Sequence, residues 1–193
     1  MKRSIFTLIV PFAIVMALSV MGFAQGRQGR VNLDVKALEG LKKIGDANWH
    51  VAGDYIEANK GNGFLVLPNT YTNFHLTAEF WTDADANSGI FIRCEDPNKV
   101  GAENAYEVNI FDKRPDPKYR TGAIVNVGEP KVKIDAAGKW NTYDITAQGT
   151  HFVIKLNGMV TVDAMDSKHP SGCIALQYGA GTVRFRKVTV EPL

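Results

Sequence analysis

The feature that most constrains the fold of this sequence is a succession of short segments in which large apolar side chains recur at every second position. Residues 73–81 are the clearest example, with aromatic, Leu or Ala side chains at alternating positions. A period of two is typical of half-buried β-strands, and a helical period is almost absent. Asn157-Gly158 stands between two such segments and favours a two-residue hairpin turn. About a dozen strands, spaced by roughly 8 to 12 residues, predict an all-β sandwich of two antiparallel sheets.

The expected strands are separated by Gly, Pro, Asn and Asp residues, which favour turns. They span residues 49–51, 55–58, 64–67, 73–81, 87–94, 106–112, 123–127, 140–147, 151–156, 159–163, 174–179 and 183–190. In the last strand the apolar positions change parity, which predicts a β-bulge near Arg186 and Lys187. Residues 34–43 fit one or two helical turns.

The N-terminal segment has a different character. Two basic residues precede a long apolar run, and small residues stand at the −3 and −1 positions of a cut after Ala24. This pattern indicates an export signal, although the run is nearly long enough for a membrane anchor. We therefore expect a signal peptide over 1–24, a flexible leader over 25–45, one sandwich domain over 46–193, and an exported protein that is periplasmic or secreted.

Charge and cysteine content bound the partners of the mature chain. Cleavage after Ala24 would remove two of the 22 basic residues and leave 20 against 20 acidic residues. Such a chain has no basic surface for nucleic acid, and we expect no membrane partner after signal cleavage. Cys94 and Cys173 each lie in an apolar strand pattern, and this pattern fits either two buried free thiols or a disulfide. The sequence does not determine the oligomeric state.

The alternation of the strands places a set of polar side chains and one Trp on a common face. They are Glu79, Trp81, Arg93, Glu107, Asn109 and Gln177. Two carboxylates, a guanidinium and two amides beside an aromatic ring have the chemistry of a sugar site, because they join hydrogen-bonding groups to an apolar surface. The alternative is a solvated sheet face on which Arg93 pairs with one of the glutamates.

A proline-containing segment follows the strand that carries Glu107. Pro115 and Pro117 exclude a helix or an interior strand over residues 112–122, so this segment is expected to be a loop. A loop in this position forms a natural rim for a site. We therefore expect Asp112 and Tyr119 to bind substrate.

The sequence gives limited support to standard hydrolytic chemistry. Glu79 and Glu107 could supply the two carboxyl groups that a glycosidase needs. The Glu-x-Asp-x-Glu cluster familiar from sandwich-fold glucanases is absent, which weakens that interpretation. Gly-x-Ser-x-Gly and the phosphate-binding P-loop are also absent from the sequence.

No metal motif is complete. The four His residues do not have the spacing of a zinc site. The segment 83–94 begins like a calcium loop, but it has Ser88 at the Gly position and Cys94 at the Glu position, so an Asx turn is favoured. A site in which carboxylates and one His hold a divalent cation is the alternative that this sequence leaves, and no metal ligand is assigned.

Eight short motifs, in order between Tyr71 and Arg186, resemble the 3-keto-disaccharide hydrolase family, and the resemblance covers roughly residues 47–193. They are Tyr71-x-Asn73-Phe74-x-Leu76-x-x-Glu79-Phe80, Asn87-Ser88-Gly89-Ile90-Phe91-x-Arg93, Tyr106-Glu107-Val108-x-Ile110-x-Asp112, Thr121-Gly122-Ala123-Ile124, Trp140-Asn141, Leu156-Asn157-Gly158, Gly172-x-Ile174-x-Leu176-Gln177 and Phe185-Arg186.

The resemblance implies a concanavalin A-like sandwich, or jelly roll, of the lectin and glucanase type. It also implies a carbohydrate-active hydrolase or lyase that cleaves 3-keto-glycosides and hydrates the 2-hydroxy-glucal product. The sequence departs from the family at two places, because Asn109 replaces a common Gln and Tyr178-Gly179 lacks a common His.

These implications lead to a hypothesis for the reaction. Glu107 is expected to remove the C2 proton, with Arg93 and Gln177 holding the C3 oxyanion. Glu79 is expected to act as the acid at the leaving oxygen. A lectin-like module that binds a saccharide without cleaving it is the main alternative, and an interaction domain with a solvated polar face is a third.

Overall fold

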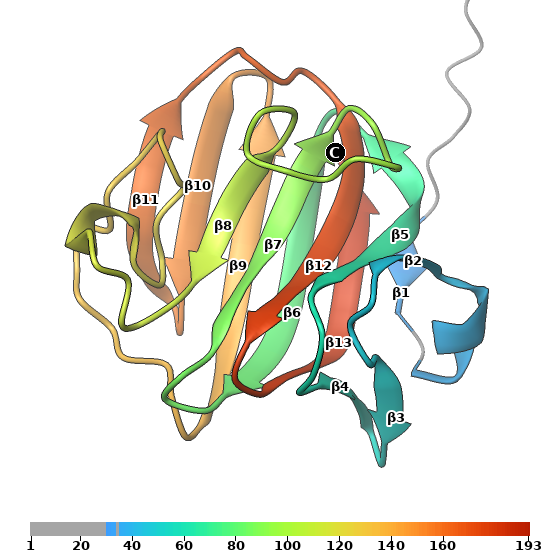
Figure 1. Cartoon of the computed structure of the whole chain (residues 1–193). Helices are drawn as coiled ribbons and strands as arrows, with labels where there is room; N and C mark the ends of the chain where they lie inside the picture. The colour runs from blue at the N-terminus through green and yellow to red at the C-terminus, as the bar shows by residue number, and fades with distance from the viewer. Residues whose placement is uncertain (1–29, 34) are drawn as a thin grey trace, which may run out of the picture.

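The computed structural model describes residues 30–33 and 35–193, and it forms two stacked antiparallel sheets (Figure 1). The eight-stranded sheet contains, in order, β11 (Met159–Met165), β10 (His151–Leu156), β9 (Trp140–Gln148), β6 (Phe74–Thr82), β13 (Val183–Pro192), β4 (Tyr55–Ala58) and β3 (His50–Ala52), with β1 (Val31–Asn32) paired to β13. The five-stranded sheet contains β2 (Lys42–Gly45), β5 (Gly63–Tyr71), β12 (Gly172–Ala180), β7 (Asn87–Cys94) and β8 (Tyr106–Ile110). The predicted all-β sandwich is confirmed.

The core lies between the two sheets and follows the alternation seen in the sequence. In β6 every second side chain is buried, and Phe80 stacks on Tyr143 of β9 with ring centroids 4.9 Å apart. Burial of each large apolar side chain stabilises the fold by about 1.5–3 kcal/mol. Within the described residues, no helix is long and apolar enough to cross a membrane. The signal peptide expected over 1–24 lies outside the described residues.

Three local expectations are confirmed. Asn157 and Gly158 adopt φ values of 52° and 81° in the β10–β11 hairpin, as a type I′ turn requires. The register of β13 shifts between Arg186 and Thr189, at the predicted bulge. The Asp83 side chain accepts a hydrogen bond from the Asp85 amide at 3.0 Å, which is an Asx turn.

Residues 31–33 and 35–45 belong to the fold, so the expectation of a flexible leader up to residue 45 is wrong for this part. β1 pairs with β13, and β2 pairs with β5. Between them, the 3₁₀ helix η1 (Val35–Gly40) carries Leu38, which is 1% exposed and packs in the main core. The strands β1 and β2 were not predicted, because the polar sequence at residues 25–30 suggested a flexible leader.

The expected strand over 123–127 is also wrong. Ile124 makes only isolated bridges, to Val108 and to Gly128. The segment nevertheless fastens to the edge of β8, because the Val125 amide donates to the Glu107 carbonyl and the Asn109 amide donates to the Ala123 carbonyl. The long connection between β8 and β9 therefore folds back beside β8 (Figure 1).

Candidate functional site

A polar cluster lies on the outer face of the five-stranded sheet, where three strands meet. Gln177 of β12 is in register with Gly89 of β7, and Gly89 is in register with Asn109 of β8. Glu107 lies two residues before Asn109, and both point away from the main core, to which Tyr106, Val108 and Ile110 contribute. The predicted parity of this strand is confirmed.

Gly89 leaves the space in which the polar groups converge. A Cβ atom at this position would stand 3.3 Å from Cγ of Glu107 and 3.4 Å from Oε1 of Gln177. No other residue type leaves this space free, and Gly89 is not in the left-handed region that favours glycine. The glycine therefore brings a carboxyl side chain and an amide side chain together across the strand.

Glu107 supplies the carboxyl group of this cluster. It is 8% exposed, and within the described residues its carboxylate has no hydrogen bond or ion pair. Burial raises the pKa of Glu107, and the positive charge of Arg114 opposes the rise. A carboxylate with a raised pKa and no partner is suited to accept a proton.

Two amide oxygens beside Glu107 also lack partners among the described residues. They are Oε1 of Gln177 and Oδ1 of Asn109, and both are closed off from solvent. Nδ2 of Asn109 donates to the Tyr119 carbonyl, so this amide is committed to holding the loop. Buried acceptors without donors are costly, so these two oxygens leave hydrogen-bonding capacity unused beside Glu107.

The expected rim residues Asp112 and Tyr119 shape the loop. The Asp112 carboxylate accepts from Oγ1 of Thr121 at 2.6 Å and from the amides of Ala136 and Ala137 at 2.7 and 3.0 Å. Tyr119 ends the 3₁₀ helix η2 (Pro117–Tyr119) and offers its carbonyl to Asn109. Both contacts are internal to the protein, so the structure assigns these residues to positioning the loop.

A second apolar cluster covers part of the same outer face. Phe91 of β7 meets Phe64 of β5 edge to face, with centroids 5.1 Å apart. The cluster comprises Val66, Phe91, Cys94, Ala105, Cys173 and Ala175. Because Phe91 shares its face with Gly89, the polar cluster has an apolar border. The alternation of side chains along β7 is the sequence pattern that places Phe91 on the same face as Gly89.

Arg93 does not lie with Glu107, so the expected common face is wrong for this residue. The register between β7 and β12 shifts near Cys173 and Ala175, and Arg93 adopts a left-handed φ of 52°. This bulge turns its side chain into the interior, where it lies over the Phe152 ring at 4.9 Å. It is 1% exposed and donates to the carbonyls of Thr72, Gly149 and His169. Arg93 therefore joins loops and has no access to substrate.

Glu79 and Trp81 are also wrongly placed by the expectation. Both lie on β6, on the outer face of the other sheet. Glu79 binds Arg186 at 2.6 Å and Lys187 at 2.7 Å. Burial acts to raise its pKa, but the hydrogen bonds from these two cations prevail and the pKa is lowered. The guanidinium of Arg184 covers the Trp81 ring at 4.1 Å.

Arg114 was not identified from the sequence. It lies in the loop after β8, and its charge acts on Glu107. Its guanidinium has no hydrogen bond or ion pair within the described part of the chain, and only a ring contact at 6.0 Å to Phe111. The sequence feature that could have identified Arg114 is its position in a proline-containing loop that follows the strand of Glu107.

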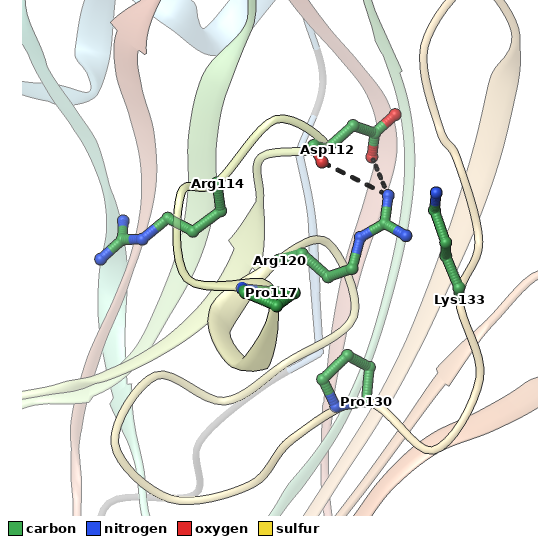
Figure 2. A pocket seen from close by; sticks show the side chains of 6 residues that line it. All are labelled: Asp112, Arg114, Pro117, Arg120, Pro130 and Lys133. Carbon is green, nitrogen blue, oxygen red and sulfur yellow. Dashed lines mark hydrogen bonds and ion pairs between the residues drawn. The ribbon is translucent and has the colours of Figure 1, made fainter.

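The same loop encloses a pocket of about 310 Å³ (Figure 2). Its lining consists of Asp112, Arg114, Pro117, Arg120, Pro130 and Lys133. Arg120 lies beside Asp112, while Arg114 points away from both (Figure 2). Among the residues that the structure describes, no group of three or more His, Cys, Asp or Glu could hold a metal ion.

The two stacked antiparallel sheets place the described part of the chain in the concanavalin A and galectin class of β-sandwiches. The chain belongs to the family of the 3-keto-alpha-glucoside-1,2-lyase-like domain, which matches residues 31–191. The resemblance noted from the eight motifs is thereby confirmed. A comparison with curated proteins gives no significant match.

Solved structures confirm the fold. A protein of Parabacteroides distasonis provisionally described as a glycosyl hydrolase is 24% identical, with a TM-score of 0.70 over 85% of this chain and 99% of that chain. A second such protein from the same organism is 18% identical, with a TM-score of 0.71 over 86% and 94%. The carbohydrate-binding module CBM66 from Bacillus subtilis is 22% identical, with a TM-score of 0.64 over 79% and 95%.

Proposed function

We propose that this protein cleaves 3-keto-glycosides on the outer face of the five-stranded sheet, with Glu107 as the base. The observation that carries the proposal is the buried Glu107 carboxylate, unpaired within the described residues, which converges with Gln177 on Gly89. Membership of the lyase-like family supports the substrate class. The export signal and an exported location, periplasmic or secreted, belong to the same proposal.

The first chemical step is removal of the C2 proton by Glu107. The ketone at C3 acidifies this proton, and the electron pair of the C2–H bond forms an enolate whose charge lies on the C3 oxygen. The guanidinium of Arg114, which has no hydrogen bond or ion pair among the described residues, and the amide nitrogen of Gln177 are the donors proposed for this oxygen. Donors placed at a developing oxyanion can each be worth about 3–4 kcal/mol.

The second step expels the group at C1. The enolate re-forms the C3 carbonyl, a double bond forms between C1 and C2, and the C1–O bond breaks. Water protonates the leaving oxygen, because Glu79 lies on the opposite sheet. In the hydration that follows, the hydroxide left by that water adds to C1, the enolate forms again, and the protonated Glu107 returns a proton to C2.

A binding module without catalysis is the second candidate. Its support is the apolar border formed by Phe64 and Phe91 beside the two amide oxygens that lack partners among the described residues, together with the fold shared with the module CBM66. Tyr178, where the family often has a His nearby, faces the core and donates to the Gly181 carbonyl at 2.9 Å. Its side chain therefore does not contribute to the cluster around Glu107.

The test is a product assay on the purified protein, in which a glucoside and its 3-keto form are offered in parallel, with and without a chelator. We expect aglycone release from the keto form alone. Release from the ordinary glucoside at a similar rate would contradict C2 proton abstraction. Binding of both sugars without release would favour the binding module.

A further inference from the structure

The lining of the pocket at the end of β8 has more cationic than acidic residues, and the Asp135 carboxylate next to it pairs with Arg120. Arg114, Arg120 and Lys133 contribute three cations to its lining, and Asp112 contributes the one carboxylate (Figure 2). Asp112 already accepts three hydrogen bonds from Thr121, Ala136 and Ala137. The distance from Oδ1 of Asp112 to Nη2 of Arg120 is 3.9 Å, so the Asp112 carboxylate compensates the charge of Arg120 only in part.

Arg120 is held in place with part of its donor capacity unused. Its side chain is 6% exposed, and Nη2 binds Asp135 and the Asp112 carbonyl. Nη1 is buried without a hydrogen-bond partner among residues 30–33 and 35–193. A buried guanidinium nitrogen that lacks an acceptor is costly, and an oxyanion is the group that removes this cost.

The other two cations are also available. The ammonium of Lys133 has one weak contact, at 4.0 Å, to Asp135, and it lies beside Arg120 (Figure 2). Arg114 has no hydrogen bond or ion pair in the described part of the chain, and its charge also acts on Glu107. The pocket and the proposed catalytic cluster therefore border each other through Arg114.

From this arrangement we infer that the pocket binds a small oxyanion carried by the sugar, which is a carboxylate or a sulfate substituent. The planar guanidinium of Arg120 matches the oxygens of such anions, and Lys133 adds a mobile cation at the rim. This inference rests on the proposed function only in placing the anion on the same sugar that reaches Glu107. The evidence for the oxyanion site itself is the set of charged side chains in the pocket, and it does not depend on the proposed function.

The test measures binding of glucuronate, glucose 6-sulfate and glucose by calorimetry at low salt. It compares the wild type with Lys133→Glu and with Lys60→Glu. Lys60 is an exposed lysine of the β4–β5 turn and serves as a matched control for the change in net charge. Because Lys133 has a 73% exposed side chain, its substitution leaves the fold intact.

We expect at least one acidic sugar to bind about tenfold more tightly than glucose, and the preferred acid identifies the oxyanion. Lys133→Glu should abolish this preference and Lys60→Glu should preserve it. Equal binding of all three sugars, no binding of any, or an equal loss in both variants would overturn the inference. If acidic sugars bind in this manner but no 3-keto-glycoside is cleaved, the proposed function fails and the oxyanion site stands.

Discussion

Glu107 and Gln177 approach each other across Gly89, with Cγ of Glu107 and Oε1 of Gln177 at 3.3 and 3.4 Å from the place where a Cβ at Gly89 would stand. The two residues are 70 positions apart in the sequence, and β7 joins the strands that carry them. The candidate site therefore depends on the absence of one side chain. A substrate that reaches the carboxylate must use this space.

Substitution of that glycine tests the dependence. In Gly89→Ala the new methyl group is tighter than ordinary contact with both side chains, and the Val108 carbonyl is also 3.3 Å away. We expect turnover of a 3-keto-glucoside to fall about tenfold or more, because small misplacements of reacting groups are costly. The free energy of unfolding should change by less than about 1.5 kcal/mol. Unchanged turnover would show that this space is not used.

The raised pKa of Glu107 predicts an inverted pH dependence of stability. Between its ordinary pKa and its raised pKa, the folded state holds a proton that the unfolded state has lost. The stability of the wild type therefore falls as pH rises through this window. We expect the free energy of unfolding of Glu107→Gln to match that of the wild type in acid and to exceed it above the raised pKa, by urea unfolding at several pH values.

Glu79→Gln is the matched control for that series. The pKa of Glu79 is lowered by Lys187 and Arg186 against the effect of burial. Its contribution to stability is therefore present above the ordinary pKa and is lost as pH falls through the lowered one. If the two substitutions changed the stability profile in the same direction, the assigned environment of Glu107 would be wrong.

The strand pattern of this sequence was sufficient to predict the sandwich fold. It was not sufficient to predict which residues form the candidate site. Alternation located the core because residues such as Phe80 and Tyr143 must leave water wherever the sheets stack. Turn chemistry located the Asn157-Gly158 hairpin because few residues tolerate positive φ. These signals are local in the chain, so they can be read without knowledge of which strands are neighbours.

The candidate site depends on long-range placement, which periodicity does not report. The strands of Glu79 and Glu107 have similar patterns, yet they belong to different sheets. A single bulged residue reversed the parity at Arg93 and moved it from the expected outer face to the interior. Glu107, Asn109 and Gln177 were correctly grouped because no bulge separates them from their cross-strand partners.

The structure makes Arg93 a stabilising residue. Its guanidinium donates to the carbonyls of Thr72, Gly149 and His169, from three different segments. Arg93→Gln leaves buried acceptors without donors, and we expect a loss of about 3–5 kcal/mol in the free energy of unfolding. Urea unfolding measures it, with the partly exposed Arg184→Gln as a control that should lose less. A loss below about 1 kcal/mol would contradict this role.

Cys94 and Cys173 are cross-strand partners in the second apolar cluster, and both thiols are free and buried. A thiol reagent reaches such groups only when the strands open. We expect labelling of the native protein to be slow and to accelerate in urea in step with unfolding. Rapid labelling of either cysteine in the folded protein would contradict the packing of this cluster.

The measurement that tests the central claim most directly is the turnover of a 3-keto-glucoside by Glu107→Gln and by Glu79→Gln, side by side with the wild type. A positioned base contributes about 10²- to 10⁴-fold, so kcat/KM should fall by at least this lower bound in Glu107→Gln. It should stay within about twofold in Glu79→Gln, because that carboxylate lies on the other sheet, paired with Arg186 and Lys187. Wild-type turnover by Glu107→Gln, or a larger loss in Glu79→Gln, would contradict a reaction on the outer face of the five-stranded sheet.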